Sequence, residues 1–189
     1  MGRTVGTTTT RSVARRSTGK AASAEPMLCQ VGTRPRSDNG YFEAMTKVIF
    51  RSGLSWTMIE DKWPNFRKAF GEFTIAKVAR FGEPDVDRLM KDAGIVRNYR
   101  KIMATIDNAR ELQAVQKQYG SIRAYLDEVS RDGEDALCKA LGRRFSFLGG
   151  STAVFFLRCV GEEMPETIRR WEEGTREKEA TGARSERVR

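Results

Sequence analysis

The spacing of large apolar residues is the feature that most limits how this chain can fold. Between residues 41 and 173 they recur at intervals of three and four, most regularly from Tyr99 to Tyr119, and no stretch alternates strictly between apolar and polar residues. Such intervals place side chains on one face of an α-helix, whereas a half-buried strand requires a period of two. The sequence therefore predicts an all-α fold, a compact bundle of short helices.

Residues that begin and end helices divide this pattern. Thr74 and Ser121 are expected N-caps, and Pro84 is expected in the first turn of a helix that stops at Gly94. Pro64 is expected to interrupt the series that starts with Trp56, because proline removes a helical hydrogen bond. Two further helices are predicted over about 134–144 and 151–160, and a last one near Pro165.

Composition predicts three parts: a disordered basic tail over 1–38, a helical domain over 39–173 and a charged flexible tail over 174–189. The first 24 residues contain no acidic residue and almost nothing apolar, so burial cannot offset their ordering entropy. An organelle transit peptide is the alternative for this Arg- and Ser-rich segment, but without large apolar residues we expect a solvated tail. Most of the formal net charge of +9 lies in the tails, so basicity alone is weak support for a nucleic-acid partner.

The absence of histidine excludes several classes of chemistry. Ser-His-Asp and Cys-His catalysis, metalloprotease helices and imidazole-bound zinc all require it. The three cysteines, Cys29, Cys138 and Cys159, lack the close spacing of a zinc site or a disulfide framework. No run approaches the roughly 18 apolar residues of a membrane span. We therefore expect no metal, no cofactor and no membrane contact, in a reducing, cytoplasmic compartment.

A glycine-rich turn between the two predicted helices over 134–144 and 151–160 is a candidate phosphate site. Gly149, Gly150, Ser151 and Thr152 open the second helix, where backbone N–H groups and the helix dipole favour an anion. Arg143 and Arg144 precede the turn. This order is typical of a helix-hairpin-helix that grips one DNA strand without reading sequence. The alternative is an ordinary turn in which glycine only permits a tight reversal.

A second candidate lies at an earlier helix junction. Gly53 and Leu54 stand between Phe50 and Trp56. Trp56 is suited to stacking on an unstacked base, and Leu54 to wedging into a base stack. The alternative is that Trp56 belongs to the core, which is the commoner fate of an isolated tryptophan.

Several motifs carry these candidates in a recognisable order: Gly53-Leu54-Ser55-Trp56, Asn65-Phe66-Arg67 with Phe70, Lys77-Val78-Ala79, Asp92-Ala93-Gly94-Ile95-Val96-Arg97-Asn98, Lys101-Ile102, Asn108-Ala109-Arg110 and Phe145-Ser146-Phe147-Leu148-Gly149. From residue 41 to 161 the chain resembles the 3-methyladenine DNA glycosylase I family of the helix-hairpin-helix DNA glycosylase superfamily. The resemblance implies a bacterial, nucleoid-associated enzyme of base-excision repair. Such an enzyme flips a damaged base from the duplex and hydrolyses its N-glycosidic bond.

The resemblance also implies roles for individual residues. Gly53 and Leu54 would fill the gap left by the flipped base. Trp56 would line the base pocket, together with Val48 and Phe50. The backbone of Gly149 to Thr152, aided by Arg143 and Arg144, would hold phosphate.

The chain differs from the family at the positions that bind zinc and at the position of the pocket carboxylate. The family's zinc site needs two histidines, and only Cys29 resembles one of its ligands. Val48 stands where the family has a pocket glutamate, and the superfamily's usual aspartate falls near Ile168. Valine can neither accept a hydrogen bond from a base nor stabilise an oxocarbenium charge.

No single acid replaces the missing carboxylate. Glu43 lies on the same predicted helix as Val48, and Glu163 lies near the position of the superfamily's aspartate. Glu60 and Asp61 follow Trp56 by about one helical turn and are candidates for the same pocket, and Glu162 and Glu166 lie near Glu163. Each has the alternative of a solvated surface charge or a helix-capping role.

We therefore expect a monomeric, monofunctional DNA N-glycosylase that acts on alkylated, 3-methyladenine-like bases and contacts the phosphates of damaged duplex DNA. One alternative is a catalytically silent DNA-damage-binding protein of the same fold. The other is a glycosylase for a neutral base such as uracil.

Overall fold

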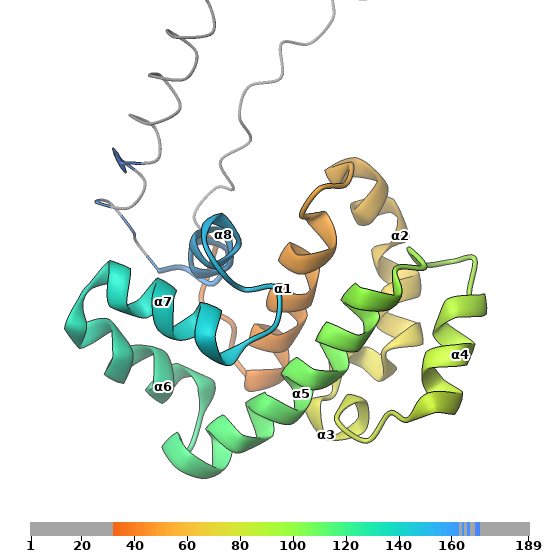
Figure 1. Cartoon of the computed structure of the whole chain (residues 1–189), viewed down its shortest axis with the longest axis horizontal. Coiled ribbons are helices and arrows are strands. Elements are labelled where there is room, and N and C mark those ends of the chain that lie inside the picture. The colour runs from red at the N-terminus through yellow and green to blue at the C-terminus, as the bar shows by residue number, and fades with distance from the viewer. Residues whose placement is uncertain (1–31, 163, 165, 167–168, 171–189) are drawn as a thin grey trace, which may run out of the picture.

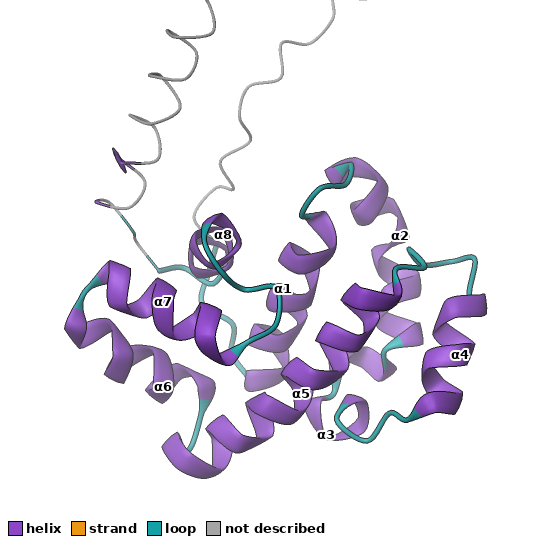
Figure 2. Ribbon diagram, viewed as in Figure 1, coloured by secondary structure: helices purple, strands orange, loops and turns teal. Residues whose placement is uncertain are grey.

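The computed structural model of the chain describes residues 32–162, 164, 166, 169 and 170. Within them the backbone forms helices and connecting loops and no strand, as Figure 2 shows. The elements are α1 (Asp38–Arg51), α2 (Trp56–Ala69), α3 (Ile75–Val78), α4 (Glu83–Lys91), α5 (Tyr99–Tyr119), α6 (Ile122–Val129), α7 (Glu134–Arg144) and α8 (Ser151–Cys159), with 3-10 turns at Gly71–Phe73 and Ser130–Asp132. The predicted all-α bundle is confirmed.

The long helix α5 is the centre of the arrangement (Figure 1). It contacts α1, α3, α4 and α6, while α7 packs on α6 and α8, and α8 returns to α1. Helices α2 to α4 therefore lie on one side of α5, and α6 and α7 lie on the other (Figure 1). No helix in the described part of the chain is long and apolar enough to cross a bilayer.

The core is rich in phenylalanine where α1 meets α2. Phe42, Phe50, Phe66, Phe70 and Phe73 are all completely buried. Their rings stack or meet edge to face at centroid separations from 4.6 to 6.4 Å. Aromatic pairs at these separations add to the free energy of burial, so this cluster fixes α2 rigidly against α1.

Pro64 does not end the second helix, contrary to the sequence prediction. It lies inside α2, which continues to Ala69. The buried face of the helix runs through Trp63 and Phe66 on both sides of the proline. Burial of that apolar face outweighs the one hydrogen bond that the proline nitrogen cannot donate.

The N-terminal boundary also differs from the prediction. Helix α1 begins at Asp38 with Ser37 as its N-cap, but the chain is already packed before it. The Gly32 amide donates to the carbonyl of Arg158 at 2.8 Å, which sets this segment against the end of α8. Residues 1–31, the predicted start of a last helix at Pro165, and the tail over 174–189 lie outside the described residues.

Candidate DNA interface and base pocket

The glycine-rich turn joins α7 to α8 as predicted. Gly150, the residue before α8, has a φ of 56° and a ψ of −131°, a conformation open almost only to glycine. A Cβ on Gly142 would lie 3.1 Å from the Cα of Gly149, so the end of α7 and the turn need glycine to approach this closely. No side chain caps the N-terminus of α8, and Gly149 to Ser151 are exposed. An anion can therefore approach these amides.

Asn108 holds this turn in place from α5. Its Nδ2 donates to the carbonyl of Ser146 at 3.0 Å, and the Ser146 amide donates back to its Oδ1 at 2.8 Å. The side chain is 1% exposed. Asn108 belongs to one of the motifs that carry the family resemblance. The sequence did not reveal its positioning role, because its hydrogen-bond partner is the backbone of a residue 38 positions away.

The two arginines before the turn have different environments. Arg143 is exposed. The Nε of Arg144 donates to Glu111 at 2.6 Å, and its guanidinium lies 5.6 and 5.1 Å from the rings of Tyr119 and Tyr125. Arg144 therefore ties α7 to α5 and α6, and its contact with phosphate beside Arg143 stays a prediction.

Gly53 and Leu54 lie in the turn between α1 and α2, shortly before Trp56. Gly53 has a φ of 73° and open space on its Cβ side, and Leu54 packs only partly against the core. The side chain of Ser55 accepts from the Met58 amide at 3.4 Å and so caps α2. Gly53 is consequently exposed at the tip of a turn that the start of α2 supports.

Trp56, the first residue of α2, lies where three helices meet. Its ring meets Phe155 of α8 edge to face, with centroids 5.9 Å apart. The guanidinium carbon of Arg51, the last residue of α1, lies 4.7 Å from the centre of the Trp56 ring. Trp56 is only partly buried, so it is not a closed core residue.

The other two predicted base-pocket residues are buried. Val48 is 5% exposed and Phe50 is completely buried. The Phe50 ring packs on Phe66 and Phe70 in the core, so the prediction that Phe50 contacts a base is wrong. Residues 42, 46 and 50 share the buried face of α1, and a four-residue helical interval carries Phe50 inward with them.

Glu43, a candidate catalytic acid, has a structural role in this fold. It accepts from Trp63 Nε1 at 2.8 Å and from Arg67 at 2.6 Å. The hydrogen bond and charge of Glu43 raise the pKa of the Arg67 guanidinium above its ordinary value. Glu43 therefore links α1 to α2, and its catalytic role stays a prediction that these contacts do not support.

The remaining candidate acids divide by position. Glu60 of α2 pairs with Lys47 at 2.7 Å and with Arg51, both on α1. Glu162 pairs with Arg123 of α6 and with Arg34. Glu163 and Ile168 lie outside the described residues. Glu60 therefore pairs with the same arginine that lies over the Trp56 ring.

Lys101, which belongs to another motif of the resemblance, is a second positioning residue whose role the sequence did not reveal. Its Nζ donates to the carbonyls of Phe50 at 3.2 Å and Ser52 at 2.5 Å, where α1 ends. The residue is 6% exposed, and burial lowers the pKa of its ammonium group. Lys101 thus ties the N-terminal half of α5 to the turn that presents Gly53.

The described residues do not fit the zinc site that the family resemblance implies. The chain has no histidine. Cys138 lies on α7 and Cys159 ends α8, and the described part of the chain gathers no three residues able to ligate a metal.

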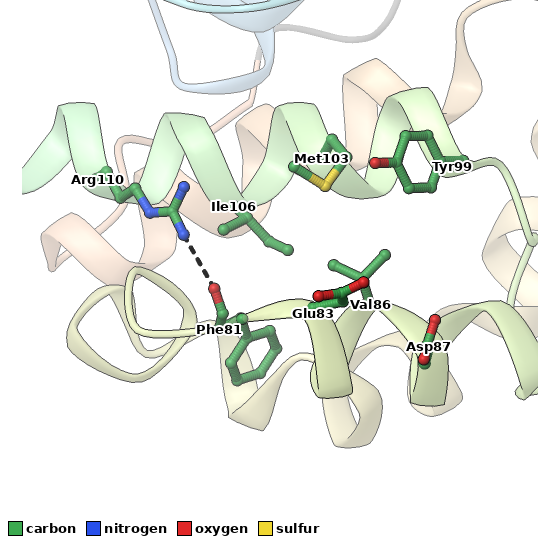
Figure 3. Close-up of a pocket in the computed structure, with 9 residues that line it drawn as sticks. Phe81, Glu83, Val86, Asp87, Tyr99, Met103, Ile106 and Arg110 are labelled. Carbon is green, nitrogen blue, oxygen red and sulfur yellow. Dashed lines mark hydrogen bonds between the residues drawn. The ribbon is translucent and has the colours of Figure 1, made fainter.

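A cavity of about 320 Å³ lies between α4 and α5, lined among others by Phe81, Val86, Tyr99 and Met103 (Figure 3). Arg110, at one end, donates to the carbonyl of Phe81 at 2.9 Å (Figure 3). Neither Trp56 nor any residue of the α7–α8 turn lines it. We therefore do not assign it to the base pocket.

The comparisons with known proteins all identify methyladenine glycosylases as similar to this chain. A protein-family model described as methyladenine glycosylase matches residues 30–137. The chain is 34% identical over 139 residues to DNA-3-methyladenine glycosylase 1 of Escherichia coli K12, a match that covers 64% of this chain and 74% of that protein. A second relative, DNA-3-methyladenine glycosylase of Haemophilus influenzae, is 27% identical over 139 residues and is covered to 75%.

Solved structures agree with these matches. A crystal structure of 3-methyladenine DNA glycosylase I superposes with a TM-score of 0.61 at 29% identity, over 74% of this chain and 90% of that one. A mutant of the Staphylococcus aureus protein of that name superposes with a TM-score of 0.62 at 25% identity, over 71% and 82%. The resemblance drawn from the motifs is thereby confirmed.

Proposed function

Because this chain belongs to the methyladenine glycosylase family, we propose that it is a monofunctional DNA N-glycosylase that excises alkylated, 3-methyladenine-like bases in base-excision repair. Its substrate is DNA, which it contacts as a monomer through the phosphates of a damaged duplex. The bacterial relatives favour action on the chromosome in the cytoplasm.

The observation that carries this proposal is the contact between Trp56 and Phe155. Phe155 lies four residues into α8, and a rise of about 1.5 Å per residue places it roughly 6 Å along the helix from Ser151. A base stacked on Trp56 is then about one nucleotide away from a phosphate bound at the N-terminus of α8. One strand of DNA can engage both places.

Each element of the interface then has a task. Leu54, at the tip of the α1–α2 turn, fills the space that the flipped nucleotide leaves. Trp56 stacks on the base. The amides of Gly149 to Ser151, together with Arg143, hold the phosphate and give affinity that is independent of sequence. The Thr152 amide donates to the carbonyl of Gly149 at 3.3 Å and so closes the turn.

The chemistry requires little from the protein when the base is already cationic. The bond between the sugar C1′ and the base nitrogen breaks with both electrons going to the base, which departs neutral. Water then adds to C1′ and loses a proton. Preorganised dipoles and stacking stabilise this charge migration, and no lysine is needed as a nucleophile: Lys101 is held on two carbonyls.

A base-release assay tests the proposal. Duplex oligonucleotides that carry 3-methyladenine, 7-methylguanine or uracil are incubated with the protein, and released bases are measured. Release of a methylated purine is expected. No release of any base, with binding to abasic DNA intact, favours the second candidate, a damage-binding protein without catalysis. The observation that favours this candidate is Val48 in place of the family's glutamate.

A further inference from the structure

Phe147, in the turn between α7 and α8, is a large apolar residue that the fold leaves exposed. It is 42% exposed and its φ is 61°, a left-handed conformation that phenylalanine rarely adopts. Its neighbours are both fixed, since Ser146 is bonded to Asn108 and Leu148 is completely buried. A turn that only had to reverse the chain between them would favour glycine or asparagine. A strained, exposed phenylalanine at this position therefore indicates a contact with another molecule.

Arg100, the second residue of α5, lies over this ring. Its guanidinium carbon is 5.8 Å from the centre of the Phe147 ring, and the residue is exposed. Among the residues that the structure describes, no acidic side chain pairs with Arg100, and the first turn of α5 carries no acid. The helix dipole also opposes a cation at a helix N-terminus. Folding therefore gains little from the charge of Arg100, which is available to an anion.

This pair lies between the two turns to which we assign contacts with DNA. Lys101, the next residue of α5, is bonded to two carbonyls at the end of α1, so the start of α5 adjoins the α1–α2 turn. Phe147 lies two residues before Gly149, and their Cα atoms are therefore at most about 7 Å apart. A strand whose phosphate is bound at the N-terminus of α8 consequently passes within reach of Phe147 and Arg100.

We propose that Arg100 and Phe147 form a second contact with the DNA backbone. Arg100 pairs with the phosphate next to the one at the N-terminus of α8, as a guanidinium is suited to do, and Phe147 packs against the sugar between the two phosphates. The inference rests on the proposed function, because it extends the DNA contact of that site. Since sugar and phosphate are common to all nucleotides, this contact gives affinity without selecting the lesion.

Binding to an abasic duplex and to an undamaged duplex, measured by fluorescence anisotropy over a range of salt concentrations, tests Arg100. Arg100→Gln should weaken binding to both duplexes and reduce the slope of log affinity against log salt by roughly one. Arg131→Gln is the matched control, because Arg131 is also exposed but precedes α7, at the opposite end of that helix from the turn. It should leave the slope unchanged. A slope that changes no more in Arg100→Gln than in Arg131→Gln overturns the inference.

Phe147→Asn tests the ring, because asparagine tolerates the left-handed backbone that phenylalanine resists. Affinity for both duplexes should fall roughly fivefold, equivalent to about 1 kcal/mol, with an unchanged salt slope. Phe147→Tyr, which keeps the ring, should bind as the wild-type chain does. Urea unfolding of each variant gives the folded fraction for which affinities are compared. Wild-type affinity of folded Phe147→Asn, or a loss confined to the abasic duplex, overturns the sugar contact.

Base release separates this inference from the proposed function. In single-turnover reactions with a 3-methyladenine duplex, Arg100→Gln should raise the protein concentration that gives the half-maximal rate and leave the saturated rate unchanged. A lower saturated rate at an unchanged half-maximal concentration would place Arg100 at the base and overturn the inference. If the wild-type chain binds both duplexes but releases no base, the proposed function fails, and the binding measurements still decide on Arg100 and Phe147. If it binds neither duplex, both fail.

Discussion

Asn108 and Ser146 exchange a reciprocal pair of hydrogen bonds, from side-chain amide to carbonyl at 3.0 Å and from backbone amide to side-chain oxygen at 2.8 Å. The pair joins the middle of α5 to the turn that opens α8. Because Asn108 is buried, the turn is fixed from the interior of the bundle.

Asn108→Ala should loosen this turn. Loss of two buried hydrogen bonds is expected to lower the free energy of unfolding by about 1–3 kcal/mol, measured by urea denaturation. Affinity for abasic DNA should fall roughly tenfold, or about 1.4 kcal/mol, because the phosphate-binding amides are no longer held in register. Asn65→Ala is the matched control, since Asn65 is exposed and bonds to Gly94 at 3.4 Å. If Asn108→Ala is destabilised but binds DNA with unchanged affinity, the turn keeps its shape without Asn108.

The neighbouring arginines should separate into two phenotypes. Arg143→Ala should weaken DNA binding equally for all sequences and reduce the slope of log affinity against log salt by roughly one. Arg144→Ala should lower the midpoint of urea unfolding, because Glu111 loses its partner, and should leave the salt slope unchanged. If both substitutions reduce the slope equally, Arg144 leaves Glu111 to reach DNA.

The fold followed from local pattern, whereas parts of the site depended on contacts between distant residues. The period of three and four residues predicted α5, α7 and α8 nearly to the residue. No local signal revealed Asn108 or Lys101, because their partners are backbone groups 38 and about 50 residues away. Phe50 was misassigned for a related reason: sequence neighbourhood placed it beside the site, but the rotation of α1 buries it in the core. The ion pair of Arg144 with Glu111 was equally invisible, because the two residues lie 33 positions apart.

Metal analysis tests a further expectation. With no histidine and with dispersed cysteines, we expect no stoichiometric zinc and an unfolding midpoint that chelator leaves unchanged. Elemental analysis and thermal melts with and without chelator measure both quantities. One tightly held zinc ion per chain would contradict the prediction and imply ligands outside the described residues.

Lys101 should give folding stability a distinctive pH dependence. Burial lowers the pKa of Lys101 below its ordinary 10.5. Between the lowered and the ordinary value the unfolded chain binds more protons than the folded chain, so stability rises with pH across that window. Below the window both states are protonated and the full cost of burying the ammonium group is present.

Urea unfolding of wild type and Lys101→Met at a series of alkaline pH values isolates this contribution. The wild-type free energy of unfolding should rise relative to that of Lys101→Met as the pH approaches 10.5, while the exposed Lys91→Met serves as the control. A difference that is flat or falls with pH would show that the two carbonyls fully compensate the burial.

Trp56→Ala tests the assignment on which the base pocket depends. If the indole stacks on a flipped base, its removal should weaken binding to lesion-containing or abasic DNA by roughly 1–3 kcal/mol. Folding stability should fall by less than the roughly 3–5 kcal/mol typical of a buried tryptophan, because Trp56 is only partly buried. Trp63→Ala provides the contrast, since Trp63 is 7% exposed and stacks on Phe66 and Phe73. The Trp63→Ala variant should lose much of its folding stability, while its folded fraction should bind DNA with normal affinity. If the two variants lose stability and DNA affinity equally, Trp56 is a core residue and the base pocket lies elsewhere.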